Sequence, residues 1–169
     1  MANESRAGFL SLLDMRPGTE LGASDWYAVT QEDIDAFARL TRDEDPYHTD
    51  PGWAREHSPL ETTISFGFLT MSMLTHFLHQ VFGRLGIESG DDIQVFNFGF
   101  NRVRMPEPVP AGAEIRGRFS FVGARLRDNG GAEITVNAVV DIKGNDRPAL
   151  VAEWLFVAVR GDGQGIDSC

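Results

Sequence analysis

Cysteine is almost absent from this sequence: the only one in 169 residues is Cys169, the last residue. No disulfide can form within the chain, so we expect a reducing compartment, the cytoplasm. The first residues lack the basic stretch and apolar run of a signal peptide. The longest apolar segment, residues 66–82, is interrupted by six polar residues. It is too short and too polar to span a bilayer.

Positive charge is also scarce. The sequence has 15 Lys and Arg residues against 25 Asp and Glu residues, which gives a net charge of −10. Binding to nucleic acid or to an anionic membrane surface needs a basic footprint. The charge balance therefore predicts neither a nucleic-acid nor a membrane partner. Internal repeats are missing as well, and 169 residues suit one domain. We expect a single domain over 1–169, with a core of about 20–160 and a flexible tail at 161–169.

The hydrophobic pattern predicts a strand, two helices around a loop, a long buried helix and then a run of strands. Thr30, followed by acidic residues, is typical of a helix cap, and Asp50-Pro51 of a second one. Between these helices lies a predicted loop, 43–50, broken by Pro46. The expected elements are a strand at 21–29, a buried helix at 67–82, and strands at 96–100, 115–122, 134–142 and 150–159. Phe96, Phe98 and Phe100 are predicted core residues, and Asn129-Gly130 a hairpin turn. One apolar helix followed by strands indicates an α+β fold with the sheet around the helix.

The predicted loop holds the residues best suited to chemistry, Asp43 and His48. With Pro46 between them they cannot share a helix face, but a loop can bring both side chains to one point. Such a pair can hold a water molecule and move its protons near neutral pH. A solvated loop or helix cap is the simpler interpretation of the spacing alone. A calcium loop is excluded, because Tyr47 and Ala54 occupy two required ligand positions.

The stretch 42–50 resembles the hydratase signature of MaoC-like proteins, Gly-Asp-x-Asn-Pro-x-His-x-Asp, and matches it at Asp43, Pro46, His48 and Asp50. Residues 63–74 resemble the family's segment Thr-Ile-Ala-His-Gly-Phe-Leu-Thr-Leu-Ser-Leu-Leu, and residues 100–112 resemble the strand and turn after its central helix. The best match is to single-domain hydratases of the nodulation-protein-N type. The resemblance extends from about residue 31 to residue 160.

This resemblance implies a hotdog fold, in which a curved antiparallel sheet wraps a long central helix. It implies that Asp43 and His48 are catalytic and that the Gly67 N–H, at the start of the helix, polarises a thioester carbonyl. Ser72 would donate to Asp43, although a hydroxyl bonded to its own helix is an equal alternative. The expected substrate-pocket residues are Tyr47, Phe66 and Phe68.

The implied reaction is reversible syn hydration of a trans-2-enoyl thioester to the (3R)-hydroxyacyl thioester. No separate cofactor is expected, since coenzyme A or phosphopantetheine would be part of the substrate. An acyl carrier protein is a possible partner. Several arginines in the second half are either solvated strand faces or a binding patch for the phosphates of such carriers: Arg102, Arg104, Arg116, Arg118, Arg125 and Arg127.

Two departures from the family stand out. Phe66 replaces the usual His before the glycine, which predicts a drier pocket that favours apolar or aromatic acyl groups. Asp45 replaces the usual Asn or Gln, so a second carboxylate either points towards Asp43 or faces solvent. His76 and His79 lie three residues apart without a third ligand, and we expect no metal site.

Several alternatives stay open at this point. One is a dehydratase of fatty-acid or polyketide synthesis that acts on a carrier-bound substrate. Another is an acyl-thioesterase, which the Asp-Pro-x-His pattern makes weaker. The last is a non-catalytic binding or assembly protein. A single hotdog leaves an open sheet edge, so we also expect a homodimer.

Overall fold

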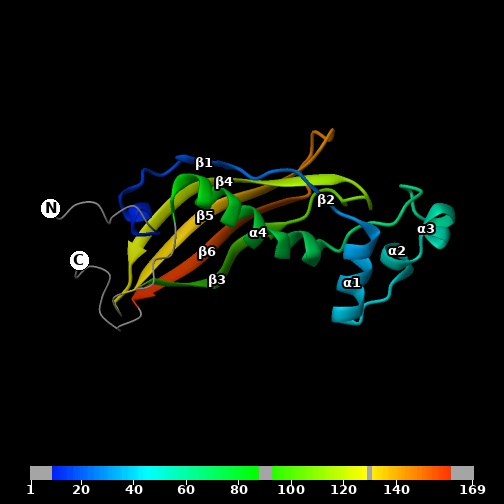
Figure 1. Ribbon diagram of the computed structural model, residues 1–169, viewed down its shortest axis with the longest axis horizontal. Helices are drawn as coiled ribbons and strands as arrows, with labels where there is room; N and C mark the ends of the chain where they lie inside the picture. Colours follow the sequence, from blue (N-terminus) through cyan, green and yellow to red (C-terminus); the bar gives the residue numbers. More distant parts are fainter. Residues whose placement is uncertain (1–8, 88–92, 129–130, 161–169) are drawn as a thin grey trace.

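The computed structural model describes residues 9–87, 93–128 and 131–160, and it combines one sheet with four α-helices. Helix α4 lies along one face of the sheet, while α1, α2 and α3 gather beyond one end of it (Figure 1). This is the predicted α+β arrangement of a sheet and a central helix. None of the helices among the described residues has the length and apolar character needed to cross a membrane.

The helices are α1 (Gln31–Thr41), α2 (Pro46–Thr49), α3 (Pro51–His57) and α4 (Gly67–Leu85), preceded by a 3-10 helix, η1 (Phe9–Asp14). The strands are β1 (Glu20–Ala23), β2 (Tyr27–Ala28), β3 (Ile93–Arg104), β4 (Glu114–Leu126), β5 (Ala132–Ile142) and β6 (Leu150–Arg160). The predicted strand at 21–29 is therefore two short strands. Both pair with β4, and β1 carries a register shift at Gly22, where φ is +120°.

All strand pairs are antiparallel, in the order β1-β4-β5-β6-β3. Strand β3 pairs with β6 and forms an edge of the described sheet, although β4 follows it in the chain. The prediction that its three phenylalanines belong to the core is wrong. Phe96, Phe98 and Phe100 are 53%, 56% and 36% exposed, because the described sheet has no strand beyond β3. Phe98 contacts the Arg127 guanidinium at 4.8 Å, and Phe100 stacks on Trp154 at 5.8 Å. The turn predicted at Asn129-Gly130 lies outside the described residues, between β4 and β5.

The core lies between α4 and the sheet. Leu74, Phe77 and Leu78 of α4 pack with Phe119 and Phe121 of β4, and all five are at most 3% exposed. The opposite side of α4 is exposed, so the prediction of a fully buried helix is only half correct. Leu12 of η1 is also fully buried, so the core begins before residue 20.

Local sequence signals explain the ends of the first helices. Thr30 and Asp33 form the capping box that starts α1, which confirms the predicted cap. Asp50 caps α3, also as predicted. The predicted loop 43–50 is wrong in its second half, because Asp45 caps a further short helix that begins at Pro46. An Asx cap followed by Pro at the first helical position forms a helix start here just as it does at Asp50-Pro51.

Candidate active site

The turn from α1 into α2 carries Asp43. Helix α1 ends at Thr41 and is capped by Arg42, whose φ of 60° is left-handed, and the Asp43 N–H returns to the Ala38 carbonyl at 3.2 Å. This reversal leaves the Asp43 side chain exposed, with Oδ1 3.4 Å from the Asp45 N–H. The carboxylate is therefore free to accept hydrogen bonds from a bound molecule.

His48 on α2 is held at three points. Its Nδ1 lies 2.7 Å from the Ile64 carbonyl oxygen, and its ring centroid lies 3.8 Å from that of Phe66. The Gln31 side chain donates to the His48 carbonyl at 2.8 Å. A carbonyl oxygen can only accept a hydrogen bond, so Nδ1 must carry the proton. In the neutral ring, Nε2 is then the basic nitrogen.

Gly67 opens α4 without a capping side chain. The residue at the N-cap position is Phe66, which offers no acceptor to the first N–H groups of the helix. Those groups have no partner within a helix, and the helix dipole adds positive potential there. A Cβ at position 67 would lie 2.3 Å from the Met105 sulfur, so only glycine fits beside Met105 without displacing it. The result is an N–H-rich surface suited to an oxygen that gains negative charge.

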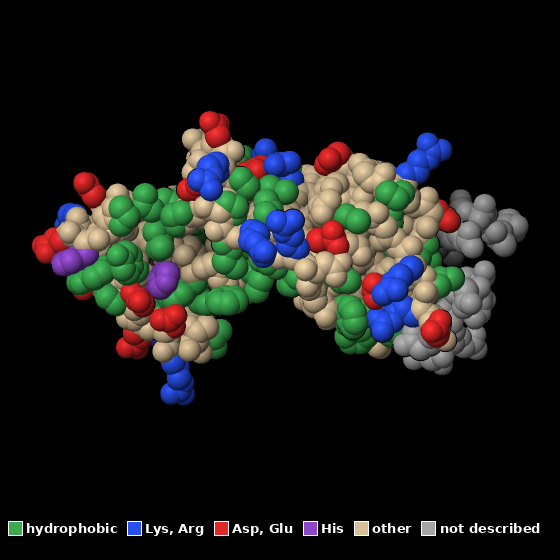
Figure 2. Space-filling model, turned by 180° about the vertical axis from the view of Figure 1, so that it is seen from behind, with side chains coloured by type: hydrophobic (Ala, Val, Ile, Leu, Met, Phe, Trp, Pro, Cys, Tyr) green, Lys and Arg blue, Asp and Glu red, His purple; other side chains and the backbone are tan. Residues whose placement is uncertain are grey.

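The Phe66 ring brings these two features together. It stacks on His48, and the next residue is Gly67, so the imidazole stands at the N-terminus of α4. Asp43 lies five residues before His48, in the turn between α1 and α2. An imidazole and the first N–H groups of α4 are thus both adjacent to Phe66. Seen from behind, hydrophobic side chains gather at the end of the molecule that holds α1, α2 and α3, on the left of Figure 2.

Several predicted roles need correction. The Ser72 hydroxyl donates to the Phe68 carbonyl at 2.8 Å, so it is bonded to its own helix and its one proton does not go to Asp43. Asp45 is exposed and accepts from the Tyr47 N–H at 2.9 Å, which makes it a helix cap facing solvent. The Phe66 ring is 4% exposed and does not line the apolar cavity between α1 and α4, so it belongs to the core.

The other two expected pocket residues are accessible but lie elsewhere. Phe68 is 66% exposed on the outer side of α4, because the helix turns it away from Phe66. Tyr47 is 38% exposed, and its ring meets the edge of Trp53 at 4.8 Å. Neither lines the apolar cavity between α1 and α4.

That cavity has a volume of about 250 Å³ and reaches the start of α4. Its lining is Tyr27, Val29, Asp33, Ala36, Phe37, Leu40, Ser65, Leu69, Thr70, Met73 and Ile115. The lining is mostly apolar, and Ser65 and Leu69 flank Phe66 and Gly67 in the chain. Its polar groups are already paired, since the Tyr27 hydroxyl donates to Asp33 at 3.1 Å.

Burial and the contact with Asp33 both raise the pKa of Tyr27. Burial by itself would raise the pKa of Asp33, but hydrogen bonds from Thr30 and Tyr27 outweigh it, and the net shift is downward. Tyr27 therefore stays neutral and Asp33 stays ionised around neutral pH, so neither suits proton transfer there. The lining of the cavity is thus suited to holding an apolar group.

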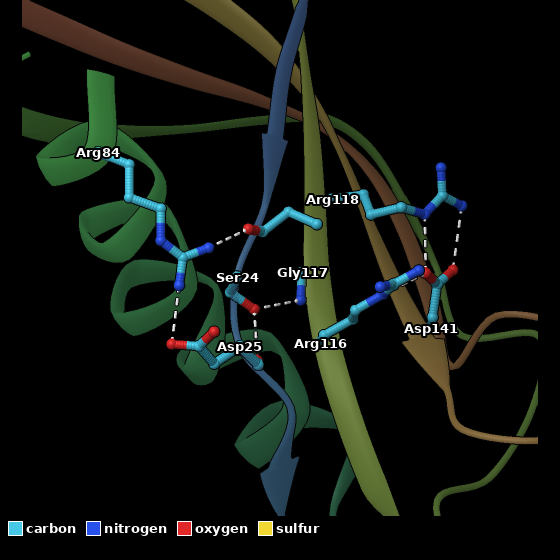
Figure 3. Close-up of polar contacts among 8 residues, drawn as sticks. Ser24, Asp25, Arg84, Arg116, Gly117, Arg118 and Asp141 are labelled. Carbon is cyan, nitrogen blue, oxygen red and sulfur yellow. Dashed lines mark hydrogen bonds and ion pairs between the residues drawn. The ribbon is translucent and has the colours of Figure 1, made fainter.

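The arginine patch is largely neutralised by acidic neighbours. Arg118 makes two hydrogen bonds to Asp141, at 2.7 and 3.0 Å, and Arg116 a third at 3.2 Å (Figure 3). Arg125 and Arg127 pair with Glu133 in the same way. These pairs favour the interpretation of solvated strand faces over a phosphate-binding patch.

His76 contacts Gln80 at 3.0 Å on the exposed side of α4. Among the residues that the structure describes, no group of three His, Cys, Asp or Glu side chains is arranged to hold a metal ion. His76 and His79 on α4 therefore have no third metal ligand beside them among the described residues.

No motif in the sequence points to the residues that hold His48 in place. Gln31 at the start of α1 reaches the carbonyl of His48 and also accepts from Thr63 at 2.5 Å. The carbonyl of Ile64 is a backbone group, invisible in a sequence motif. The resemblance of the Thr63-Ile64 pair to the family's segment before the glycine is the one sequence feature that points to this part of the chain.

Comparison with known proteins places this arrangement in a family. The family model described as the MaoC-like domain matches residues 13–142. The chain belongs to the MaoC-like domain family. Its hotdog fold, predicted from the sequence, is confirmed by solved structures of the same architecture. A monoamine oxidase regulatory protein from Archaeoglobus superposes with a TM-score of 0.74 at 25% identity, covering 90% of this chain and 94% of that chain.

Sequence relatives of this MaoC-like protein include two curated proteins. It is 38% identical to 3-hydroxyacyl-thioester dehydratase Z of Mycobacterium tuberculosis over 136 residues, 80% of this chain and 86% of that protein. It is 36% identical to nodulation protein N of Rhizobium leguminosarum bv. viciae over 150 residues, 88% and 91% of the two chains. The (R)-hydratase of A. caviae, at 22% identity and a TM-score of 0.63, shares the fold over 84% of this chain and 96% of its own.

Proposed function

We propose that this protein is a hydro-lyase that reversibly adds water to a trans-2-enoyl thioester and forms the (3R)-hydroxyacyl thioester. The observation that carries the proposal is the position of His48, with a free Nε2, at the uncapped N-terminus of α4. Relatives named as a 3-hydroxyacyl-thioester dehydratase and an (R)-hydratase support the reaction class and the (R) hand.

In the proposed reaction, the thioester carbonyl oxygen accepts from the Gly67 N–H. Asp43 and His48 hold the attacking water between them. As the water oxygen bonds to C3, Nε2 of His48 takes one of its protons, and negative charge moves to the carbonyl oxygen. The pair then returns a proton to C2, which completes the addition of one water molecule. Dehydration is the same path in reverse.

The acyl chain would enter the apolar cavity between α1 and α4. This cavity begins beside Gly67 and is lined mainly by aliphatic and aromatic side chains. Burying each methylene there contributes about 0.8 kcal/mol. Coenzyme A or phosphopantetheine would be carried in with the substrate, and no dissociable cofactor takes part.

We also propose that two copies associate along β3. This edge strand offers unpaired backbone groups together with Phe96 and Phe98, each more than half exposed. An exposed strand edge with large apolar side chains is stabilised by pairing with another strand. A second copy supplies an identical edge and brings the two sets of phenylalanines out of water.

The test is hydration of crotonyl-CoA, followed by the loss of absorbance of the enoyl thioester. We expect turnover and a (3R) product, with a longer enoyl-CoA and a carrier-bound enoyl thioester run alongside. No turnover on any of the three would refute the proposal and favour a non-catalytic protein. Hydrolysis to the free acid and thiol would instead indicate a thioesterase.

A further inference from the structure

Phe66 lies closer to the proposed catalytic imidazole than any other side chain ring in the described structure. Its ring centroid is 3.8 Å from that of His48, and the two planes differ by 30°. It also meets Phe37, at 5.2 Å. Because Phe66 is only 4% exposed and contacts both rings, it cannot move aside without opening the core.

We propose that Phe66 is a positioning residue that fixes the ring plane of His48 and so keeps Nδ1 protonated and Nε2 free. The proposal rests on the function proposed above. It assigns the phenyl ring a role that does not involve touching the substrate.

The need for such a residue follows from the imidazole itself. The torsion that turns the ring is broad and has two opposed orientations. A rotation of the ring out of its present plane would carry Nδ1 away from the Ile64 oxygen and break the 2.7 Å contact. The ring could then place its proton on Nε2, where it could no longer accept a proton from water. A flat ring stacked on one face restricts that turn.

The same short segment supplies both restraints. Ile64 and Phe66 are two residues apart, and the segment is fixed by two backbone hydrogen bonds, from Ile64 N–H to Tyr47 O at 3.1 Å and from Ser65 N–H to Val109 O at 2.7 Å. The hydrogen bond to His48 and the ring stack therefore share one rigid support, adjacent to the Gly67 N–H. A phenyl ring at this place can only pack, so it does not compete with Ile64 for the imidazole proton.

The decisive variant is Phe66→Leu, which keeps an apolar side chain but removes the ring. Phe121→Leu is the matched control, since Phe121 is 2% exposed, lies on β4 and lines neither the cavity nor His48. Nitrogen-15 NMR of the imidazoles reports the tautomer, and the His48→Gln spectrum identifies the His48 signals among the four histidines.

In the wild type we expect neutral His48 to be the Nδ1–H form. In Phe66→Leu we expect a mixture of tautomers, a fall in kcat of about 10- to 100-fold and little change in KM, as for a misplaced catalytic group. Phe121→Leu should lose thermal stability but keep the wild-type tautomer and kcat. This difference separates positioning from a general loss of packing.

The proposal is overturned if Phe66→Leu keeps the wild-type tautomer, or if Phe121→Leu changes it equally. Should Phe66→Leu not fold, Phe37→Leu, which removes a ring that packs on Phe66, must shift the tautomer in the same direction. An Nε2–H form in the wild type would also overturn it. The spectra need no substrate, so a protein inactive on every enoyl thioester would refute the proposed function while the NMR result still decides the role of Phe66.

Discussion

Replacing Gly67 by Ala tests the oxyanion site with a single methyl group. The new Cβ would lie 2.3 Å from Sδ and 3.3 Å from Cε of Met105. These are the outer atoms of a flexible side chain that is 42% exposed, so Met105 can swing towards solvent. We expect overpacking to cost about 1 kcal/mol, partly offset by the better helix propensity of Ala. A chain of this size would then lose about 2–4 °C in Tm at most.

The effect on catalysis should be much larger. The methyl group stands beside the N–H that would receive the thioester oxygen, and it prevents a close approach of the substrate. Loss of one oxyanion donor costs about 10²- to 10³-fold in kcat, or about 2.7–4 kcal/mol. Gly67→Ala should therefore stay folded but retain only about one hundredth of the wild-type turnover.

Gly83→Ala provides the control within the same helix. A Cβ at Gly83 meets nothing within 4 Å, so we expect a gain of about 0.5–1 kcal/mol in stability and unchanged turnover. The assays are kcat/KM on an enoyl thioester and thermal unfolding followed by circular dichroism. If Gly67→Ala turns over substrate as fast as Gly83→Ala, the backbone of residue 67 does not bind the reacting carbonyl.

Three further predictions concern the metal, the assembly and the pH dependence. Dialysis against EDTA should leave turnover unchanged, and a loss that zinc restores would contradict this. Sedimentation should give twice 18.6 kDa, and Phe98→Lys should shift it towards the monomer; a monomeric wild type at micromolar concentration would refute pairing along β3. Burial would raise the pKa of Asp141, but hydrogen bonds from Arg118 and Arg116 outweigh it and lower that pKa. Its stabilisation is therefore present above the unfolded value of about 3.9 and is lost as the pH falls through the lower folded value. Asp141→Asn should cost about 1 kcal/mol at neutral pH and progressively less as the pH falls below the unfolded value, as measured by urea unfolding; a cost that does not fall with pH would contradict the ion pairs.

The elements that the sequence predicted well are those with local signals. The Thr30 capping box starts α1, and alternating burial marks β4, β5 and β6. Asp45-Pro46 has the same helix-start pattern as Asp50-Pro51, an Asp cap followed by Pro. Applying that pattern to both pairs would have predicted α2.

Long-range placement could not be predicted in this way. Alternating phenylalanines in β3 look the same whether a core or a partner covers them, and the exposure of Phe98 depends on β3 pairing with β6 at the edge. The stack of Phe66 on His48 joins residues 18 positions apart, and the bond from Gln31 to His48 joins residues 17 apart. The sequence motifs identified His48 and Gly67 as site residues. Only the folded structure shows that the Phe66 ring lies against His48 beside Gly67.

The most direct measurement of the central claim is the turnover of crotonyl-CoA by Asp43→Asn and His48→Gln beside the wild type, at equal concentration and with circular dichroism of each. Both groups would act on one water molecule, so each variant should lose about 10²- to 10⁴-fold in kcat while keeping its fold. A folded His48→Gln protein that hydrates crotonyl-CoA at the wild-type rate would contradict the assignment of His48 as the acid–base group.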